Sequence, residues 1–149
     1  MPEYLETTVD KFIFRVAADR VYTREGLWAL AEGSRVRIGL SDYLQQRSGD
    51  IAFAEVKPVG TILSAGDEVA TIETVKVNVV LPSPVAGKVE DINPLMANTP
   101  EAVNQDPYGQ GWLAVIEANA LETDQSRLLS PQAYLELIRR EAEEEVKKL

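Results

Sequence analysis

Short stretches in which apolar and polar residues alternate dominate the chain, and they predict β-strands. Near the N-terminus, Phe12, Phe14 and Val16 recur every second residue, which is the period of a strand with one buried face. Comparable alternating or short apolar stretches follow in residues 22–30, 35–38, 51–56, 62–63, 69–74, 79–81, 88–92 and 112–116. A chain of many short strands separated by turns is expected to form a β-barrel or a β-sandwich.

Two segments between the strands carry the start signals of short helices. Ser41 and Asp42 can cap a helix that runs to Arg47, because their side chains accept the free N–H groups of a first turn. Thr99 followed by Pro100 predicts another short helix, with Thr99 as the N-cap and proline at the first helical position.

The clearest helix signal lies near the C-terminus. Residues 124–129 predict a polar connection, after which a helix is expected over residues 130–148. Its apolar stripe returns at three- and four-residue steps and consists of Leu135, Ile138, Ala142, Val146 and Leu149. The opposite face is largely acidic, whereas helices on membrane surfaces tend to be basic. We therefore expect this helix to pack on the strands, and we expect no membrane association.

The composition fits one folded domain with an acidic surface. The chain has 149 residues, of which 45% are hydrophobic, and this length suits a single domain with a real core. Lys and Arg number 15 and Asp and Glu number 24, which gives a formal net charge of −9. Because no local basic patch offsets this charge, nucleic-acid binding is not expected.

The sequence contains neither cysteine nor histidine. Disulfides, thiolate nucleophiles, Cys/His metal sites and Ser–His–Asp machinery are therefore excluded, and we predict no catalytic residues and no metal site. No apolar stretch approaches the roughly 20 residues that span a bilayer, and the N-terminus lacks the features of a signal peptide. We expect a monomer in the prokaryotic cytoplasm, or in an organelle matrix if a targeting segment has been removed.

The segment that could carry chemistry is residues 60–93, which contains a hairpin between two turns. If residues 69–74 and 79–81 pair, Lys76 falls near the connecting turn and points into solvent. A modifying enzyme could reach this lysine and build an amide on its nitrogen, which would remove the charge. Glu73 is either a solvent-facing strand residue or a charge that marks the lysine for that enzyme.

Sequence blocks in and around this hairpin resemble a known family. Residues 73–76 (Glu-Thr-Val-Lys) resemble the Glu-Ser/Thr-Val/Asp-Lys motif of lipoyl-bearing domains, and residues 82–89 resemble the second half of those domains. Three further blocks are similar, in order and spacing, to signature blocks of the glycine cleavage system H protein family: residues 41–45, 49–51 and 103–112.

This resemblance implies a fold and a modification. The fold would be mainly β, a flattened β-barrel of the barrel-sandwich hybrid type found in lipoyl and biotinyl carriers, with short flanking helices and a C-terminal helix. Residues 1–19 would be an N-terminal extension with a strand, and residues 20–149 would be the H-protein-like lipoyl domain. Lys76 would carry lipoic acid in amide linkage, as the one cofactor-binding residue.

The implied role is that of a carrier protein, not of an enzyme. A lipoylating enzyme would modify Lys76, and the swinging arm would take an aminomethyl group from glycine decarboxylase to an aminomethyltransferase. Dihydrolipoyl dehydrogenase would then reoxidise the arm. The lack of Cys and His fits this role, because the redox sulfurs would belong to the cofactor.

Departures from the family pattern leave alternatives open. The family usually has His-Glu/Thr-Trp where this chain has Glu25-Gly26-Leu27-Trp28, so that the Trp is kept and the His is replaced. The family also prefers small residues where this chain has Val-Asn-Val-Val after Lys76. One alternative is an H-protein-like lipoate-binding protein that carries sulfur intermediates for a heterodisulfide-reductase-like complex of sulfur oxidation. Another is a non-lipoylated binding or regulatory module. Biotinylation ranks lower, because biotin sites resemble Met-Lys-Met and Lys76 lies between two valines.

Other conspicuous residues are interpreted as structural. Trp28, Tyr43 and Trp112 are expected in the core, since burial accounts for most such rings. Residues 104–111 are rich in Asn, Asp, Pro and Gly, which suits turns. We therefore use this last segment as a family marker and assign it no part in the mechanism.

Overall fold

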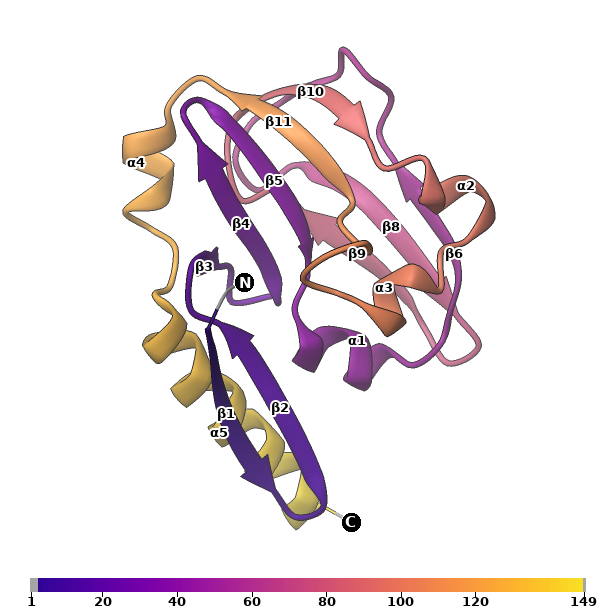
Figure 1. The fold of residues 1–149 in the computed structure, drawn as a ribbon, viewed down its shortest axis with the longest axis vertical. Coiled ribbons are helices and arrows are strands. Elements are labelled where there is room, and N and C mark those ends of the chain that lie inside the picture. Colours follow the sequence, from indigo (N-terminus) through magenta and orange to yellow (C-terminus); the bar gives the residue numbers. More distant parts are fainter. Residues whose placement is uncertain (1–2, 149) are drawn as a thin grey trace.

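The computed structural model describes residues 3–148, and its strands form three antiparallel sheets (Figure 1). One sheet has the order β3-β4-β5-β11-β10-β7, one has the order β6-β8-β9, and the third is the hairpin β1-β2. The strands are β1 (Tyr4–Val9), β2 (Phe12–Ala17), β3 (Val21–Tyr22), β4 (Leu27–Glu32), β5 (Arg35–Leu40), β6 (Ile51–Val56), β7 (Ile62–Leu63), β8 (Glu68–Thr74), β9 (Asn78–Pro82), β10 (Gly87–Ile92) and β11 (Ala114–Ala118). The helices are α1 (Asp42–Ser48), α2 (Leu95–Asn98), α3 (Ala102–Gln105), α4 (Leu121–Gln125) and α5 (Pro131–Lys147).

The six-stranded and three-stranded sheets enclose the main core between them. Their inward side chains form one cluster, in which Ile38 of β5, Ile72 of β8 and Ile116 of β11 are fully buried. Removing such a side chain from water contributes roughly 1.5–3 kcal/mol to folding. This arrangement, with short helices at its edge, confirms the predicted mainly β, barrel-sandwich hybrid fold.

Two helices begin where the sequence predicts. The Ser41 hydroxyl accepts the backbone N–H of Leu44 at 3.1 Å and caps α1. Ser130 caps α5 in the same way, and the buried face of α5 carries Tyr134 and Ile138. Leu149, the last residue of the predicted stripe, lies outside the described residues. Among residues 3–148, no helix is long and apolar enough to cross a membrane.

The predicted continuous strand over residues 22–30 is wrong, because a turn divides it. The N–H of Thr23 donates to the carbonyl of Leu27 at 2.8 Å, so that β3 and β4 form a hairpin. Gly26 supplies the positive φ of 105° that this turn requires. The polar residues Thr23 to Gly26, which separate the apolar residues of β3 and β4 in the sequence, form this turn.

Two predictions about helices also differ from the structure. Thr99 ends α2 instead of capping the next helix, and the N-cap of α3 is Glu101, without a side-chain hydrogen bond. The predicted polar connection at residues 124–129 begins within α4. There the Asp124 carboxylate is buried and accepts the N–H of Ala86 at 2.8 Å. This long-range contact explains why a polar residue belongs to a packed helix.

The predicted strand near the N-terminus pairs with a second strand, β1, that the sequence did not predict. Together β1 and β2 form a hairpin (the N-terminal hairpin, residues 4–17), in which Tyr4 pairs with Ala17 and Val9 with Phe12. Glu and Thr residues obscure the alternation of β1 in the sequence. The hairpin packs against α1 and α5 around a second apolar cluster, which includes Phe14 and Tyr134.

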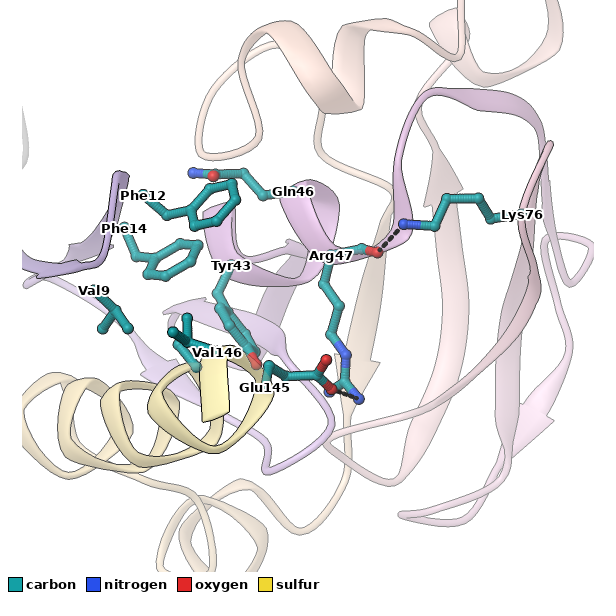
Figure 2. A pocket seen from close by; sticks show the side chains of 10 residues that line it. Val9, Phe12, Phe14, Tyr43, Gln46, Arg47, Lys76, Glu145 and Val146 are labelled. Atoms are coloured by element: carbon teal, nitrogen blue, oxygen red, sulfur yellow. Dashed lines mark hydrogen bonds and ion pairs between the residues drawn. The ribbon is translucent and has the colours of Figure 1, made fainter. Parts of the chain in front are cut away.

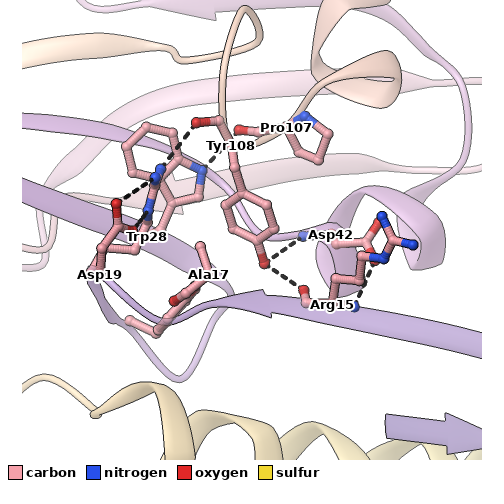
Figure 3. A network of polar contacts seen from close by, with 9 residues as sticks. Arg15, Ala17, Asp19, Trp28, Asp42, Pro107 and Tyr108 are labelled. Carbon is pink, nitrogen blue, oxygen red and sulfur yellow. Dashed lines mark hydrogen bonds and ion pairs between the residues drawn. The ribbon is translucent and has the colours of Figure 1, made fainter. Parts of the chain in front are cut away.

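Side chains from other parts of the fold form hydrogen bonds with backbone groups along one edge of this hairpin (Figure 3). The N–H of Arg15 donates to the Asp42 carboxylate at 2.9 Å, and the Tyr108 hydroxyl donates to the Arg15 carbonyl at 2.7 Å. Gln46 donates to the carbonyl of Ile13 at 3.0 Å. Burial raises the pKa of Tyr108 to about 12, so its hydroxyl keeps its proton at neutral pH. These bonds fix the hairpin beside α1.

Candidate functional site

Lys76 lies at the tip of the β8–β9 hairpin, in a well-defined turn. The last strand pair is Glu73 opposite Asn78. The N–H of Thr74 donates to the carbonyl of Val77 at 2.9 Å. The Thr74 hydroxyl accepts the N–H groups of Lys76 and Val77 at 3.1 and 3.0 Å. The backbone of the turn is thus held in place, while the side chain of Lys76 is exposed.

The side chain of Lys76 extends across the C-terminal end of α1 (Figure 2). Its Nζ lies 3.5 Å from the carbonyl oxygen of Arg47. A Cβ added to Gly49 would lie 3.6 Å from the Cδ of Lys76, so the aliphatic part of the lysine passes over this glycine. Carbonyl groups at a helix C-terminus favour a cation, which explains the position of the ammonium group.

Asn104 holds the backbone beneath Lys76. Its side-chain oxygen accepts the N–H of Ile51 at 2.9 Å, and its nitrogen donates to the carbonyl of Gly49 at 3.0 Å. The same nitrogen donates to the side chain of Gln45 at 3.1 Å. One residue of the turn-rich segment therefore joins the end of α1 to the start of β6. Turn chemistry in the sequence did not indicate this role.

We expect Asn104→Ala to lower the free energy of unfolding by about 1–2 kcal/mol, because the backbone groups of Gly49 and Ile51 lose their partner. Urea denaturation measures the difference. Asn119→Ala is the matched control, since Asn119 is exposed and a surface change of this kind costs less than about 0.5 kcal/mol. Equal stability of the two variants would show that Asn104 does not hold this turn.

A groove of about 400 Å³ opens beside Lys76, between the N-terminal hairpin, α1 and α5. Phe12 and Phe14 supply much of its apolar wall. Arg47 lies between Lys76 and these rings, within 3.5 Å of the Glu145 carboxylate (Figure 2). The groove is therefore apolar inside and charged at the end that faces Lys76.

Tyr43 lines this groove, and its ring packs edge-on against Phe14 with the centroids 5.0 Å apart. Its hydroxyl is buried and has no hydrogen-bond partner among residues 3–148. Burial, followed by the nearby Glu141 carboxylate, raises the pKa of this phenol above its ordinary value. The hydroxyl thus stays protonated at neutral pH without stabilising the fold through a hydrogen bond.

We expect Tyr43→Phe to leave the free energy of unfolding unchanged or to raise it by up to about 1 kcal/mol, because an unpaired buried hydroxyl is removed. Tyr134→Phe is the matched control. Its hydroxyl is 2.7 Å from the Ser41 hydroxyl, so its loss should cost about 1 kcal/mol. A urea denaturation series compares both variants with the parent protein. A clear loss of stability in Tyr43→Phe would contradict this account.

The aromatic residues named from the sequence do not all reach the core. Trp28 is fully buried and donates its indole N–H to the carbonyl of Pro107 at 2.9 Å. Tyr43 is buried as predicted. Trp112 is only half-buried, and the guanidinium of Arg37 lies 4.7 Å from the centre of its ring. The prediction of core burial is therefore wrong for Trp112.

Comparison with known proteins places the chain in a family. The model of the glycine cleavage H-protein family matches residues 20–141, which is most of the chain. The chain belongs to the glycine cleavage H-protein family. The match begins directly after the N-terminal hairpin and includes Lys76 and Asn104.

Individual relatives in the H-protein family agree with this assignment. The glycine cleavage system H protein of Thermus thermophilus is 39% identical over 127 residues, which cover 85% of this chain and 98% of the relative. That of Carboxydothermus hydrogenoformans is 41% identical over 129 residues, which cover 86% of this chain and 98% of the relative. A crystal structure of the H protein from Mycobacterium marinum has a TM-score of 0.72 and 29% identity, covering 80% of this chain and 95% of that one.

The comparisons confirm the family that the sequence blocks indicated. The sulfur-oxidation alternative gains no support from them, since the relatives described above are all named as glycine cleavage H proteins. Members of the H-protein family are non-catalytic carrier components of the glycine cleavage system.

Proposed function

We propose that Lys76 is the lipoylation site of this chain, and that the protein is the lipoyl carrier of glycine cleavage. The observation that carries the proposal is an exposed lysine at the tip of a tight hairpin, in a chain that belongs to the H-protein family. The family carries lipoic acid on a lysine. Lys76 also stands within the motif that resembles those of lipoyl-bearing domains.

The surroundings of Lys76 fit a covalent arm. Its side chain is exposed, and within residues 3–148 no carboxylate lies at ion-pair distance from it. Among the described residues, the one polar contact of its side chain is the long hydrogen bond to the carbonyl of Arg47. Little therefore has to be broken before an enzyme can acylate the amine, and the ordered backbone of the turn keeps the attachment point fixed.

Acylation also changes how the lysine interacts with α1. An amide nitrogen carries no positive charge, so its attraction to the carbonyl at the end of α1 weakens. The formal net charge of the protein goes from −9 to −10, since one positive charge is lost. We infer that the modified side chain leaves the surface over Gly49 more readily than the free lysine does.

The proposed partners are those of the family. Lipoic acid would supply the disulfide that takes up the group in transit. The chain would present the arm in turn to glycine decarboxylase, aminomethyltransferase and dihydrolipoyl dehydrogenase, without catalysing a step itself. Attachment to a docked carrier raises the local concentration of the arm at each partner. We propose that the protein works as a monomer in the bacterial cytoplasm.

The domain division is part of the same proposal. Residues 20–149 would form the lipoyl domain, and residues 1–19 an extension to it. The family match that begins at residue 20 supports this division, as does the pairing of β1 with β2 alone.

The test has two stages. The protein is produced together with a lipoylating enzyme and lipoate, and its intact mass and peptide map are measured. We expect a gain of one lipoyl group on the peptide that contains Lys76. The lipoylated protein should then support glycine–bicarbonate exchange by an active glycine decarboxylase. An unmodified Lys76, with a known carrier modified in the same cells, would refute the lipoyl assignment, and a lack of exchange would refute the glycine role.

A further inference from the structure

The two edges of the N-terminal hairpin differ in how their backbone groups are satisfied. The N–H of Ala18 donates to the carbonyl of Glu3 at 2.8 Å, so this pair of residues is hydrogen-bonded across the hairpin. Hydrogen-bonded and non-bonded pairs alternate in an antiparallel ladder. The backbone groups of every second residue therefore point away from the opposite strand. These outward residues are Tyr4, Glu6 and Thr8 in β1, and Ile13, Arg15 and Ala17 in β2.

Side chains occupy the outer edge of β2 but not that of β1. The carbonyl groups of the outward residues of β2 each accept a hydrogen bond from a side chain outside the hairpin. This edge lies beside α1, whereas β1 lies on the side of the hairpin that is turned away from α1 (Figure 1). Among residues 3–148, the outward backbone groups of Tyr4, Glu6 and Thr8 have no hydrogen-bond partner. We call these unpaired groups the β1 edge.

The β1 edge lacks the features that commonly protect exposed strands. Such strands are often very short or bulged, or they carry proline or lysine. The strand β1 has six residues, none of which is proline or lysine, and its register with β2 is continuous. An edge of this kind can receive a further strand, whose main-chain hydrogen bonds supply the affinity.

The side chains of β1 define the two faces that an added strand would continue. Leu5 and Val9 belong to the second apolar cluster, on the face that packs on α5. Glu6 and Thr8 are exposed on the opposite face. Because α5 packs mainly against β1 and less against β2, the helix also lies close to the position of an added strand. Such a strand would direct apolar side chains towards α5 and polar side chains towards solvent.

Charge selects the occupant of the β1 edge. Residues 3–9 include Glu3 and Glu6 and no basic residue, and the whole chain has a net charge of −9. A second copy of the chain fits poorly, because antiparallel pairing of all three outward residues would set two copies of Glu6 directly opposite each other. A basic residue at that position fits well. On the other side of β1, Arg15 of β2 lies opposite Glu6, with its Nε 3.0 Å from the carboxylate.

We propose that the β1 edge docks an extended, basic segment of a partner enzyme, which adds to the N-terminal hairpin as a third strand. This inference rests on the proposed carrier role, since the partner is one of the enzymes that use the arm. Phe12 and Phe14 of the hairpin line the same groove as Lys76, so an enzyme held at β1 stays beside the arm. The hairpin precedes residues 20–141, which the family model matches. The contact therefore belongs to the extension and not to the matched domain.

Hydrogen exchange of the full chain tests this contact directly. The exchange rates of single backbone N–H groups are measured by NMR, for the protein alone and mixed in turn with glycine decarboxylase, aminomethyltransferase and dihydrolipoyl dehydrogenase from the same organism. We expect the N–H groups of Tyr4, Glu6 and Thr8 to exchange at least about tenfold more slowly with one of these enzymes. The N–H groups of Leu5 and Thr7, which point towards β2, are the internal control and should change less.

Proline at an outward position tests the same contact in an activity assay of the lipoylated chain. Glu6→Pro removes an N–H that β2 does not use, and edge strands tolerate proline at such positions. We expect this variant to raise the KM for the carrier about tenfold with the enzyme identified by exchange, at low and at high salt. Glu6→Gln is the matched control, because it keeps the N–H and should raise the KM only at low salt.

A second pair of variants repeats the comparison without a change of charge. Thr8→Pro should raise the same KM, whereas Thr8→Ser, which keeps the outward N–H, should leave it unchanged. Melting temperatures verify that all four variants are folded.

Three results would overturn the proposal. Unchanged exchange at Tyr4, Glu6 and Thr8 with all three enzymes would show that none of them pairs with the β1 edge. Equal KM values for Glu6→Pro and Glu6→Gln would show that the backbone takes no part in docking. A dimer in sedimentation analysis that Glu6→Pro converts to a monomer would show that a second copy occupies the edge. Failure of the proposed function differs from all three, because the parent protein itself would then not be lipoylated on Lys76.

Discussion

The Lys76→Arg variant is expected to remain unlipoylated and to support glycine–bicarbonate exchange only at the level measured without carrier protein. Arginine keeps the positive charge and can still donate to the carbonyl of Arg47, so the fold around the turn should persist. Its guanidinium stays protonated and cannot act as the nucleophile in acyl transfer. Intact mass after incubation with ligase, lipoate and ATP measures the first effect, and an exchange assay measures the second.

Lys88→Arg is the control for this variant. Lys88 is an exposed lysine on β10, in the other sheet. This control should be lipoylated once and should keep full carrier activity. A lipoyl group on Lys76→Arg would place the attachment site on another lysine, and normal exchange without any lipoyl group would refute the carrier role.

Trp28→Ala is expected to lower the free energy of unfolding by about 3–5 kcal/mol, the largest stability effect that we predict. Trp28 is fully buried, and its indole N–H donates to Pro107 at 2.9 Å. A Cβ added to Gly39 would lie 2.5 Å from the ring, which shows how closely the backbone of β5 packs against it. The Arg20 guanidinium lies 4.5 Å from the centre of the ring. The variant therefore loses packing, a hydrogen bond and a cation–π contact together.

Urea denaturation followed by circular dichroism tests this expectation. Ile62→Ala serves as the control, because its side chain is mostly exposed and should contribute less than about 0.5 kcal/mol. A loss below about 1 kcal/mol in Trp28→Ala would mean that the second apolar cluster closes without this ring. A shift in the urea midpoint at an unchanged m-value reports a loss of stability. A changed m-value would instead indicate a change in the unfolded state.

The pattern of short strands and turns was enough to predict a β-barrel or a β-sandwich, and the family resemblance implied the barrel-sandwich hybrid. Alternation in residues 51–56 and 69–74 matches β6 and β8 closely, because both strands bury one face against the core. Local capping chemistry placed the starts of α1 and α5, since Ser41 and Ser130 act on N–H groups only three residues away. Strands and helix starts can be predicted from the sequence where the interactions that stabilise them are between residues close together in the chain.

Features that depend on contacts between residues far apart in the chain could not be predicted from the sequence. The strand β1 is stabilised by β2 and α5 more than by its own pattern. Asp124 joins a packed helix because Ala86, 38 positions away, donates to it. Asn104 looked like a turn residue, yet its partners Gln45, Gly49 and Ile51 precede it by more than 50 positions.

The sequence by itself determined the class of fold, the family and the hairpin that presents Lys76, because alternation, turns and short motifs are local properties of the chain. Only the tertiary structure decided what surrounds the lysine. The contact of Lys76 with the carbonyl of Arg47 and the groove beside the N-terminal hairpin both combine segments that are far apart in sequence. Their positions follow from the packing of whole sheets and helices, and no local pattern encodes that packing.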